Sequence, residues 1–142
     1  MTTRVDFYVL PEDSPEGPLP TACRLCEKAV NAGARVHVHI PDPEKAAEFD
    51  RLLWVYKQNS FIGHQRAGAA DADLASVLIG DGEPPASHLA VLVNLGEDVP
   101  AYFERFERVL EIVHGERSTR ARSRARFKTY RDRGHAVETH NL

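Results

Sequence analysis

The sequence predicts one α/β domain over residues 1–142, with helices packed on a mostly parallel sheet in three layers. Strand-like and helical patterns alternate through the first 57 residues, which is typical of parallel strands joined by right-handed crossovers. A later run, His88 to Leu95, is almost continuously apolar, as expected of a central strand buried on both faces. A chain of 142 residues is long enough to bury the core that such a domain needs.

The first half of the chain supplies two strand and helix pairs. Val5 to Leu10 is rich in β-branched and aromatic residues and precedes a proline, which favours a strand. Apolar residues then recur with helical spacing from Thr21, and a glycine is placed to end this helix at Gly33. Arg35 to Ile40 alternates, with valines and isoleucine on one side and His37 and His39 on the other. An Asp-Pro-Glu start predicts a second helix from Asp42 to about Lys57.

The second half is less regular. Ser60 to His64 and Ser76 to Ile79 are candidates for short strands. Pro100 to His114 is predicted to be a helix, because its large apolar residues recur at helical spacing. The basic segment Arg117 to Gly134 is predicted to form a fourth helix, and Ala136 to Thr139 a last strand.

The composition excludes several classes of protein. No apolar run approaches the roughly 20 residues of a membrane span, and the N-terminus lacks the apolar core of a signal peptide. We therefore expect a cytoplasmic protein that does not enter a membrane. Neither a phosphate-binding loop nor a nucleophile elbow occurs, so we expect no catalytic residues, no cofactor and no nucleotide.

Charge divides the chain into two unequal parts. Residues 1–116 hold ten basic and 19 acidic residues, a net charge of −9. Residues 117–142 hold eight basic and two acidic residues, a net charge of +6. The overall charge of −3 thus hides a polarised molecule, whose basic segment is expected to meet a negatively charged partner.

The predicted basic helix places five cations on one stripe beside Phe127. These are Arg117, Arg120, Arg124, Lys128 and Arg131. Nucleic acid, a phosphate-bearing small molecule and an acidic peptide are possible ligands. A nucleic-acid-binding domain is usually basic as a whole, whereas most of this chain is acidic. A groove for a short acidic peptide fits the pattern better, and Phe127 and Tyr130 are candidates to line an apolar pocket for one of its side chains.

Two further patterns have a structural and a functional interpretation. Cys23 and Cys26 form a C-x-x-C motif, which is typical of redox pairs, but Cys26 also falls on the apolar stripe of its helix. His37 and His39 share a strand face and have the geometry to share a metal, but no third ligand is evident. We favour the structural interpretation of both: a buried thiol for the motif, and a solvated or edge face for the histidines. No metal site is predicted.

Trp54 and Phe61 lie at the end of the second predicted helix and just beyond it. Each is a candidate core residue by its chemistry. Large aromatic residues at the end of an element are also characteristic of interface hot spots.

Several segments occur in the order and spacing of a known family. They are F-Y-V-L (Phe7 to Leu10), A-C-R-L-C-E-K-A (Ala22 to Ala29), L-L-W with S-F-I-G-H (Leu52 to His64), V-L-V-N-L (Val91 to Leu95), F-E-R-F-E-R-V (Phe103 to Val109) and R-x-R-x-R-F-K-x-Y-R (Arg122 to Arg131). In these segments the chain resembles, nearly end to end, the chi subunit of bacterial DNA polymerase III.

The resemblance implies a Rossmann-like fold and a non-catalytic accessory subunit of the clamp-loader assembly in DNA replication. The polymerase activity of such a complex would reside in other subunits. The resemblance further implies binding of the acidic C-terminal tail of single-stranded-DNA-binding protein, so that DNA is contacted mainly indirectly. Matching positions place the tail site at Arg124, Phe127, Lys128 and Arg131, with Arg120 at its margin. Direct binding of single-stranded nucleic acid by the basic helix is the alternative.

The resemblance also implies a second interface, for a psi subunit or another clamp-loader subunit. Matching positions place it at Trp54, Phe61 and His64. The family often has Phe-x-Pro-His at this point, whereas this chain has Gly63 in place of the proline.

Overall fold

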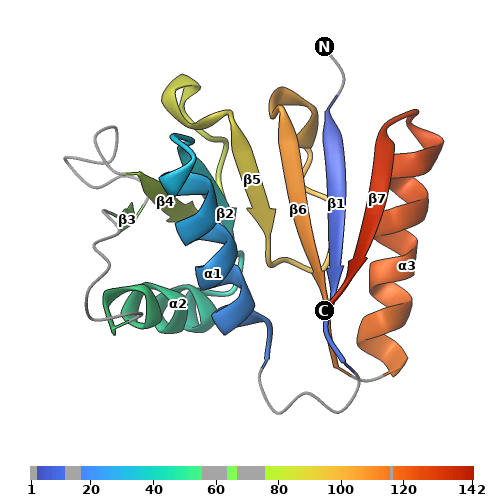
Figure 1. Ribbon diagram of the computed structural model, residues 1–142, viewed down its shortest axis with the longest axis horizontal. Coiled ribbons are helices and arrows are strands. Elements are labelled where there is room, and N and C mark those ends of the chain that lie inside the picture. Colours follow the sequence, from blue (N-terminus) through green and yellow to red (C-terminus); the bar gives the residue numbers. More distant parts are fainter. Residues whose placement is uncertain (1–2, 12–16, 56–63, 67–75, 116) are drawn as a thin grey trace.

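The computed structural model describes residues 3–11, 17–55, 64–66, 76–115 and 117–142. Within these residues the chain forms one seven-stranded sheet with three α-helices (Figure 1). The strands are β1 (Arg4–Val9), β2 (Val36–His39), β3 (His64–Arg66), β4 (Val77–Gly80), β5 (Val91–Asn94), β6 (Arg108–Val113) and β7 (Ala136–Asn141). The helices are α1 (Pro18–Asn31), α2 (Pro43–Val55) and α3 (Arg117–Asp132), with short 3-10 turns η2 (Ala86–His88) and η3 (Phe103–Arg105).

The strand order is β3-β4-β2-β5-β6-β1-β7, and every neighbouring pair is parallel. This confirms the predicted three-layer α/β fold. None of the described helices is long and apolar enough to cross a membrane.

Two apolar clusters fill the space on either side of the sheet. On one face, α1 and α2 pack on alternate residues of the central strands, such as Val36 and Val38. On the other face, α3 and the η3 segment pack on the opposite set, which includes Val5, Phe7 and Leu92. The period-two alternation of each strand therefore supplies both clusters.

Most predicted elements are confirmed, with small shifts at their ends. The helix predicted from Thr21 begins earlier, at Pro18, and Gly33 follows its end with a positive φ of 90° that glycine adopts without strain. The predicted last strand forms as β7. Of the strand predicted from Ser60 to His64, only His64 lies within the described residues, at the start of β3.

The helix predicted from Pro100 to His114 is wrong. The structure has the short η3 turn followed by β6, which lies between β5 and β1. The residues predicted to point inward are nevertheless buried, including Phe103, Phe106 and Val109. A tight turn and a strand bury the same apolar residues as a helix, because a central parallel strand is buried on both faces and its apolar run has no strict alternation. The basic helix is consequently the third α-helix of the described residues, not the fourth.

Candidate functional site

A buried polar network fixes the position of α3 on the sheet. Glu111 of β6 is fully buried, and its carboxylate accepts hydrogen bonds from three side chains. Arg126 donates at 3.0 Å, Tyr130 at 2.6 Å and Asn94 at 2.8 Å. Burial raises the pKa of the Glu111 carboxyl, although the Arg126 charge and the three donors oppose this shift. Because Arg126 and Tyr130 lie one turn apart on α3, their bonds to a single carboxylate set the rotation of the helix.

Arg126 is also held by two other groups. Its guanidinium donates to the backbone carbonyl of Glu97 at 2.8 Å and to the hydroxyl of Ser123 at 3.1 Å. We predicted that Arg126 belonged to a solvated face, and this is wrong. Tyr130 is likewise fully buried, so it does not line a surface pocket as expected.

The rotation of α3 places Phe127 at the edge of a groove between the helix and the sheet. Its ring is half-buried against Phe7, with 5.4 Å between the ring centroids. Beside this contact lies a pocket of about 220 Å³. It is lined by Phe7, Val9, Val113 and Thr139 from three strands, and by Arg120, Ser123, Arg124 and Phe127 from α3. The pocket therefore combines an apolar floor with two guanidinium groups at its wall.

The cations of this face differ in what holds them. Arg120 donates to the backbone carbonyls of Gly115 and Leu10, at 3.0 Å each, and so is fixed against the start of the groove. Arg124 and Lys128 are exposed, and in the described part of the chain their side chains have no hydrogen bond or ion pair. Arg131 is exposed and lies 3.8 Å from its neighbour Asp132. At least two cations of the stripe thus remain available to an anionic ligand.

Of the predicted peptide-binding residues, Arg120, Arg124 and Phe127 line one pocket. Lys128 and Arg131 do not line it, but follow Arg124 by one and two turns on the exposed side of α3. The predicted partner interface is not tested: Phe61 lies outside the described residues, and the side chains of Trp54 and His64 are not described.

Other arginines of the basic segment have intramolecular partners. Arg122 pairs with Glu97. Arg133 pairs with Glu104, and its guanidinium lies 5.4 Å from the centre of the Phe103 ring. These residues therefore do not present free charge, although the sequence placed them on a solvated face.

The C-x-x-C motif belongs to the core. Cys23 and Cys26 are both fully buried, unpaired, and part of the apolar cluster between α1 and the sheet. Burial raises the pKa of Cys23 to about 12 and raises that of Cys26 as well. A redox cysteine needs an accessible thiolate, so the structure favours the packing role of this motif.

The paired histidines share one strand face, as predicted, but that face is not solvated. β2 lies at the centre of the sheet, where His37 is 1% exposed and His39 is half-buried. The hydroxyl of Tyr102 lies 2.5 Å from Nδ1 of His39 and 3.4 Å from Nε2 of His37. Among the described residues no third metal-ligating side chain joins the two imidazoles.

The burial of His37 predicts a pH dependence of stability. Burial, with the nearby His39 and His88, lowers the pKa of His37 from 6.5 to about 4. Between these values the unfolded chain binds more protons than the folded protein, so stability falls as the pH falls from about 6.5 towards 4. We expect a His37→Gln variant to lose about 2 kcal/mol less stability than the parent between pH 7 and pH 4.5. Urea denaturation at both pH values measures this difference, and equal losses in the two proteins would contradict it.

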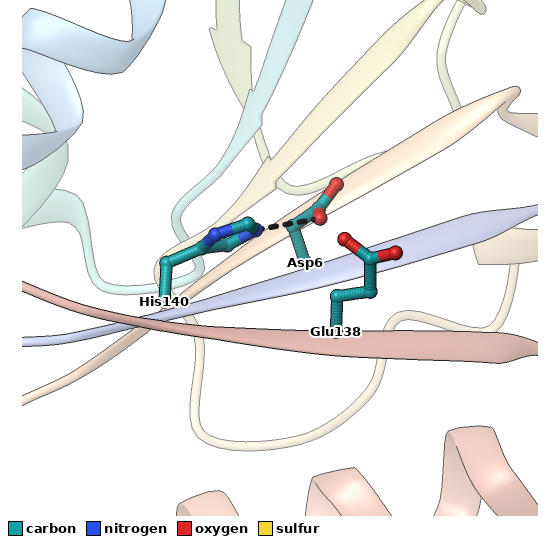
Figure 2. Close-up of side chains that lie close together, drawn as sticks. All are labelled: Asp6, Glu138 and His140. Carbon is teal, nitrogen blue, oxygen red and sulfur yellow. Dashed lines mark hydrogen bonds and ion pairs between the residues drawn. The ribbon is translucent and has the colours of Figure 1, made fainter.

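One group of side chains has the spacing of a metal site. Ligand atoms of Asp6, Glu138 and His140 lie within 4.8 Å of one another, and Figure 2 shows His140 directed at Asp6. The carboxylates are already paired: Arg108 lies 2.7 Å from Asp6, and Arg4 lies 3.3 Å from Asp6 and 3.0 Å from Glu138. Burial alone would raise the pKa of Asp6, but hydrogen bonds from His140 and Arg108 hold it below its usual value. Two guanidinium groups at this position repel a metal ion, so the cluster serves to tie β1, β6 and β7 together.

Sequence reasoning missed the floor of the pocket and the Glu111 network. One signal was present: Glu111 is the only acid in the apolar run of β6, and a lone carboxylate there requires a buried cationic partner. The pocket floor had no such signal, because its residues come from strands that are distant in the sequence.

Comparison with known proteins agrees with the resemblance noted in the sequence. Residues 1–138 match the family model described as DNA polymerase III chi subunit, HolC. The chain is 41% identical over 140 residues to a Pseudomonas aeruginosa protein named DNA polymerase III subunit chi, covering 99% of this chain and 97% of that protein. Proteins of the same name from Escherichia coli and Haemophilus influenzae are 27% and 24% identical, with 94% and 100% of this chain covered and 94% and 99% of theirs. The chain therefore belongs to the DNA polymerase III chi subunit family, whose members are named as subunits of a replicative polymerase.

Proposed function

We propose that this chain is a non-catalytic chi subunit that binds the acidic C-terminal tail of single-stranded-DNA-binding protein, and so links the clamp-loader assembly to coated DNA. The observation that carries the proposal is the pocket beside α3, which joins an apolar floor to a cationic rim. A peptide that ends in an aromatic residue offers the complementary parts: a ring for the floor, and a terminal carboxylate for the guanidinium groups.

The cations have distinct roles in this proposal. Arg120 and Arg124 flank the pocket and would bind the terminal carboxylate. Lys128 and Arg131 lie further along α3 and would attract the acidic residues that precede it. Phe127 would pack against the terminal ring at the edge of the groove.

A titration with a tail peptide tests the proposal. The probe is an acidic peptide that ends in Asp-Asp-Ala-Ala-Pro-Phe, compared with the same peptide lacking the phenylalanine. Burying an aromatic side chain contributes about 1.5–3 kcal/mol, so we expect removal of the phenylalanine to weaken binding at least tenfold. Calorimetry at fixed salt concentration measures both affinities. Equal affinities would mean that charge alone recruits the peptide, and no binding would reject the proposal.

Direct binding of single-stranded DNA by α3 is the alternative. Its cations would contact phosphates, so affinity would fall steeply with salt and would not depend on any peptide. The acidic remainder of the chain and the pairing of Arg122 and Arg133 within the protein both disfavour it. Tight, salt-sensitive DNA binding by the isolated chain would favour it.

We also propose that Trp54, Phe61 and His64 contribute to the interface with a psi subunit or another clamp-loader subunit. The support is their match to the family pattern and their distance in sequence from α3.

A further inference from the structure

The sheet has a topological switch point between β2 and β5. After β2 the chain enters α2, which packs on the same face as α1 through Ala46 and Phe49. After β5 it crosses to the opposite face, where Phe103 and Phe106 pack beside α3. The two strands are neighbours, so their outgoing connections diverge and leave a crevice at the carboxyl ends of the strands (Figure 1). In open α/β sheets such a crevice is the usual position of a ligand.

A cavity of about 630 Å³ occupies this crevice, almost three times the volume of the pocket beside α3. Both outgoing connections line it. Its walls are His39, Pro41, Asp42 and Lys45 after β2, Asp81 after β4, and residues 95–102 after β5.

Buried Asn94 shapes the wall that follows β5. Its side-chain oxygen accepts from the Gly96 amide at 2.9 Å, and its side-chain nitrogen donates to the Asp98 carbonyl at 3.1 Å. A Cβ on Gly96 would lie 3.1 Å from the His39 ring, so the loop is closely applied to β2. The cavity is therefore formed before any ligand binds.

Two neutral rings form the inner surface of the cavity. His39 and Tyr102 are hydrogen-bonded to each other at 2.5 Å. Burial lowers the pKa of His39 and raises that of Tyr102 to about 12, so neither ring carries charge near neutral pH. The negative charge of Asp81 reaches both rings, since it raises the pKa of each.

The outer wall is predominantly acidic. Asp42, Asp81 and Asp98 face the single lysine Lys45, while Glu97 is already paired with Arg122. Within the described residues the side chains of Asp81 and Asp98 have no hydrogen bond or ion pair. These carboxylates are not among the side chains spaced to share one metal ion. The arrangement instead suits an extended organic cation.

We propose that this cavity binds a guanidinium or primary ammonium group, carried by a basic peptide segment or by a free polyamine. The neutral rings accept or donate hydrogen bonds at its inner end, and Asp81 and Asp98 pair with the charge. This site is separate from the tail pocket and does not depend on the proposed function.

Nuclear magnetic resonance titration of the full chain tests the proposal with two trivalent probes, spermidine and the peptide acetyl-Arg-Gly-Arg-Gly-Arg-amide. We expect saturable shifts of the Gly96 amide and of the His39 and Tyr102 rings with at least one probe. The probe that binds tenfold more tightly identifies the source of the cation. The variant with Asp81→Asn and Asp98→Asn should bind at least fivefold more weakly.

A matched control is Glu48→Gln, which removes one exposed charge of α2 outside the cavity and should leave the affinity unchanged. The absence of saturable shifts at the three reporters would overturn the proposal. So would equal weakening in the control and in the cavity variant, because it would show attraction to net charge alone. Titration of each sample with the tail peptide reports on the fold and separates failure of this site from failure of the tail pocket.

Discussion

Replacing Glu111 with alanine is expected to lower the free energy of unfolding by about 3–5 kcal/mol, because Arg126 would then be a buried cation without its counter-charge. Arg126 is 8% exposed, and Glu111 is its only carboxylate partner among the described residues. The change also removes the acceptor of the Tyr130 hydroxyl and of the Asn94 amide. Urea denaturation at pH 7 measures the loss.

Arg122→Ala is the matched control for this prediction. Arg122 belongs to the same helix and also pairs with a glutamate, but both partners of that pair are exposed. Exposed ion pairs contribute about 1 kcal/mol or less, so this variant should remain close to the parent. Similar losses in both variants would show that the Glu111 network does not hold α3 in place.

Reversing two charges of the cationic face is expected to weaken tail-peptide binding at least a hundredfold. The variant is Arg124→Glu with Lys128→Glu, which replaces two unpaired cations with two anions beside an anionic ligand. Hydrogen bonds to charged groups contribute about 1.5–3 kcal/mol each, and repulsion adds to their loss. Calorimetric titration with the tail peptide measures the change, and a melting curve checks that the fold is kept.

Arg122→Glu provides the control, since it makes the same kind of charge reversal on the opposite side of α3, next to Glu97. It should weaken binding no more than a few fold at physiological salt, where charges separated by more than about 8 Å are largely screened. Equal weakening by the control would indicate attraction to the net charge of the helix, without a defined site.

The fold was largely predictable, because strands and helices alternate and because most elements carry a clear pattern. The one element of the wrong type, Pro100 to His114, shows where this reasoning fails. Its apolar residues satisfy a helical period, but their place between β5 and β1 is set by tertiary pairing. The same pairing buries His37, which a single strand viewed alone appeared to leave at a solvated face.

The site was predictable only where one helix carries it. Arg120, Arg124 and Phe127 are close in sequence, so helical spacing alone brought them together. The floor of the pocket is built by strands β1, β6 and β7, whose adjacency follows from the sheet order. Arg126 looked like its neighbours in the basic run, and only its pairing with Glu111 separates it from them.

The location of the bound tail is the most direct test of the account. Intermolecular nuclear Overhauser effects can be recorded between the labelled chain and the unlabelled tail peptide. We predict contacts from the terminal phenylalanine ring to the methyl groups of Val9 and Val113 and to the ring of Phe127. A saturated complex whose peptide ring contacts other surfaces, and none of these three residues, would contradict the account.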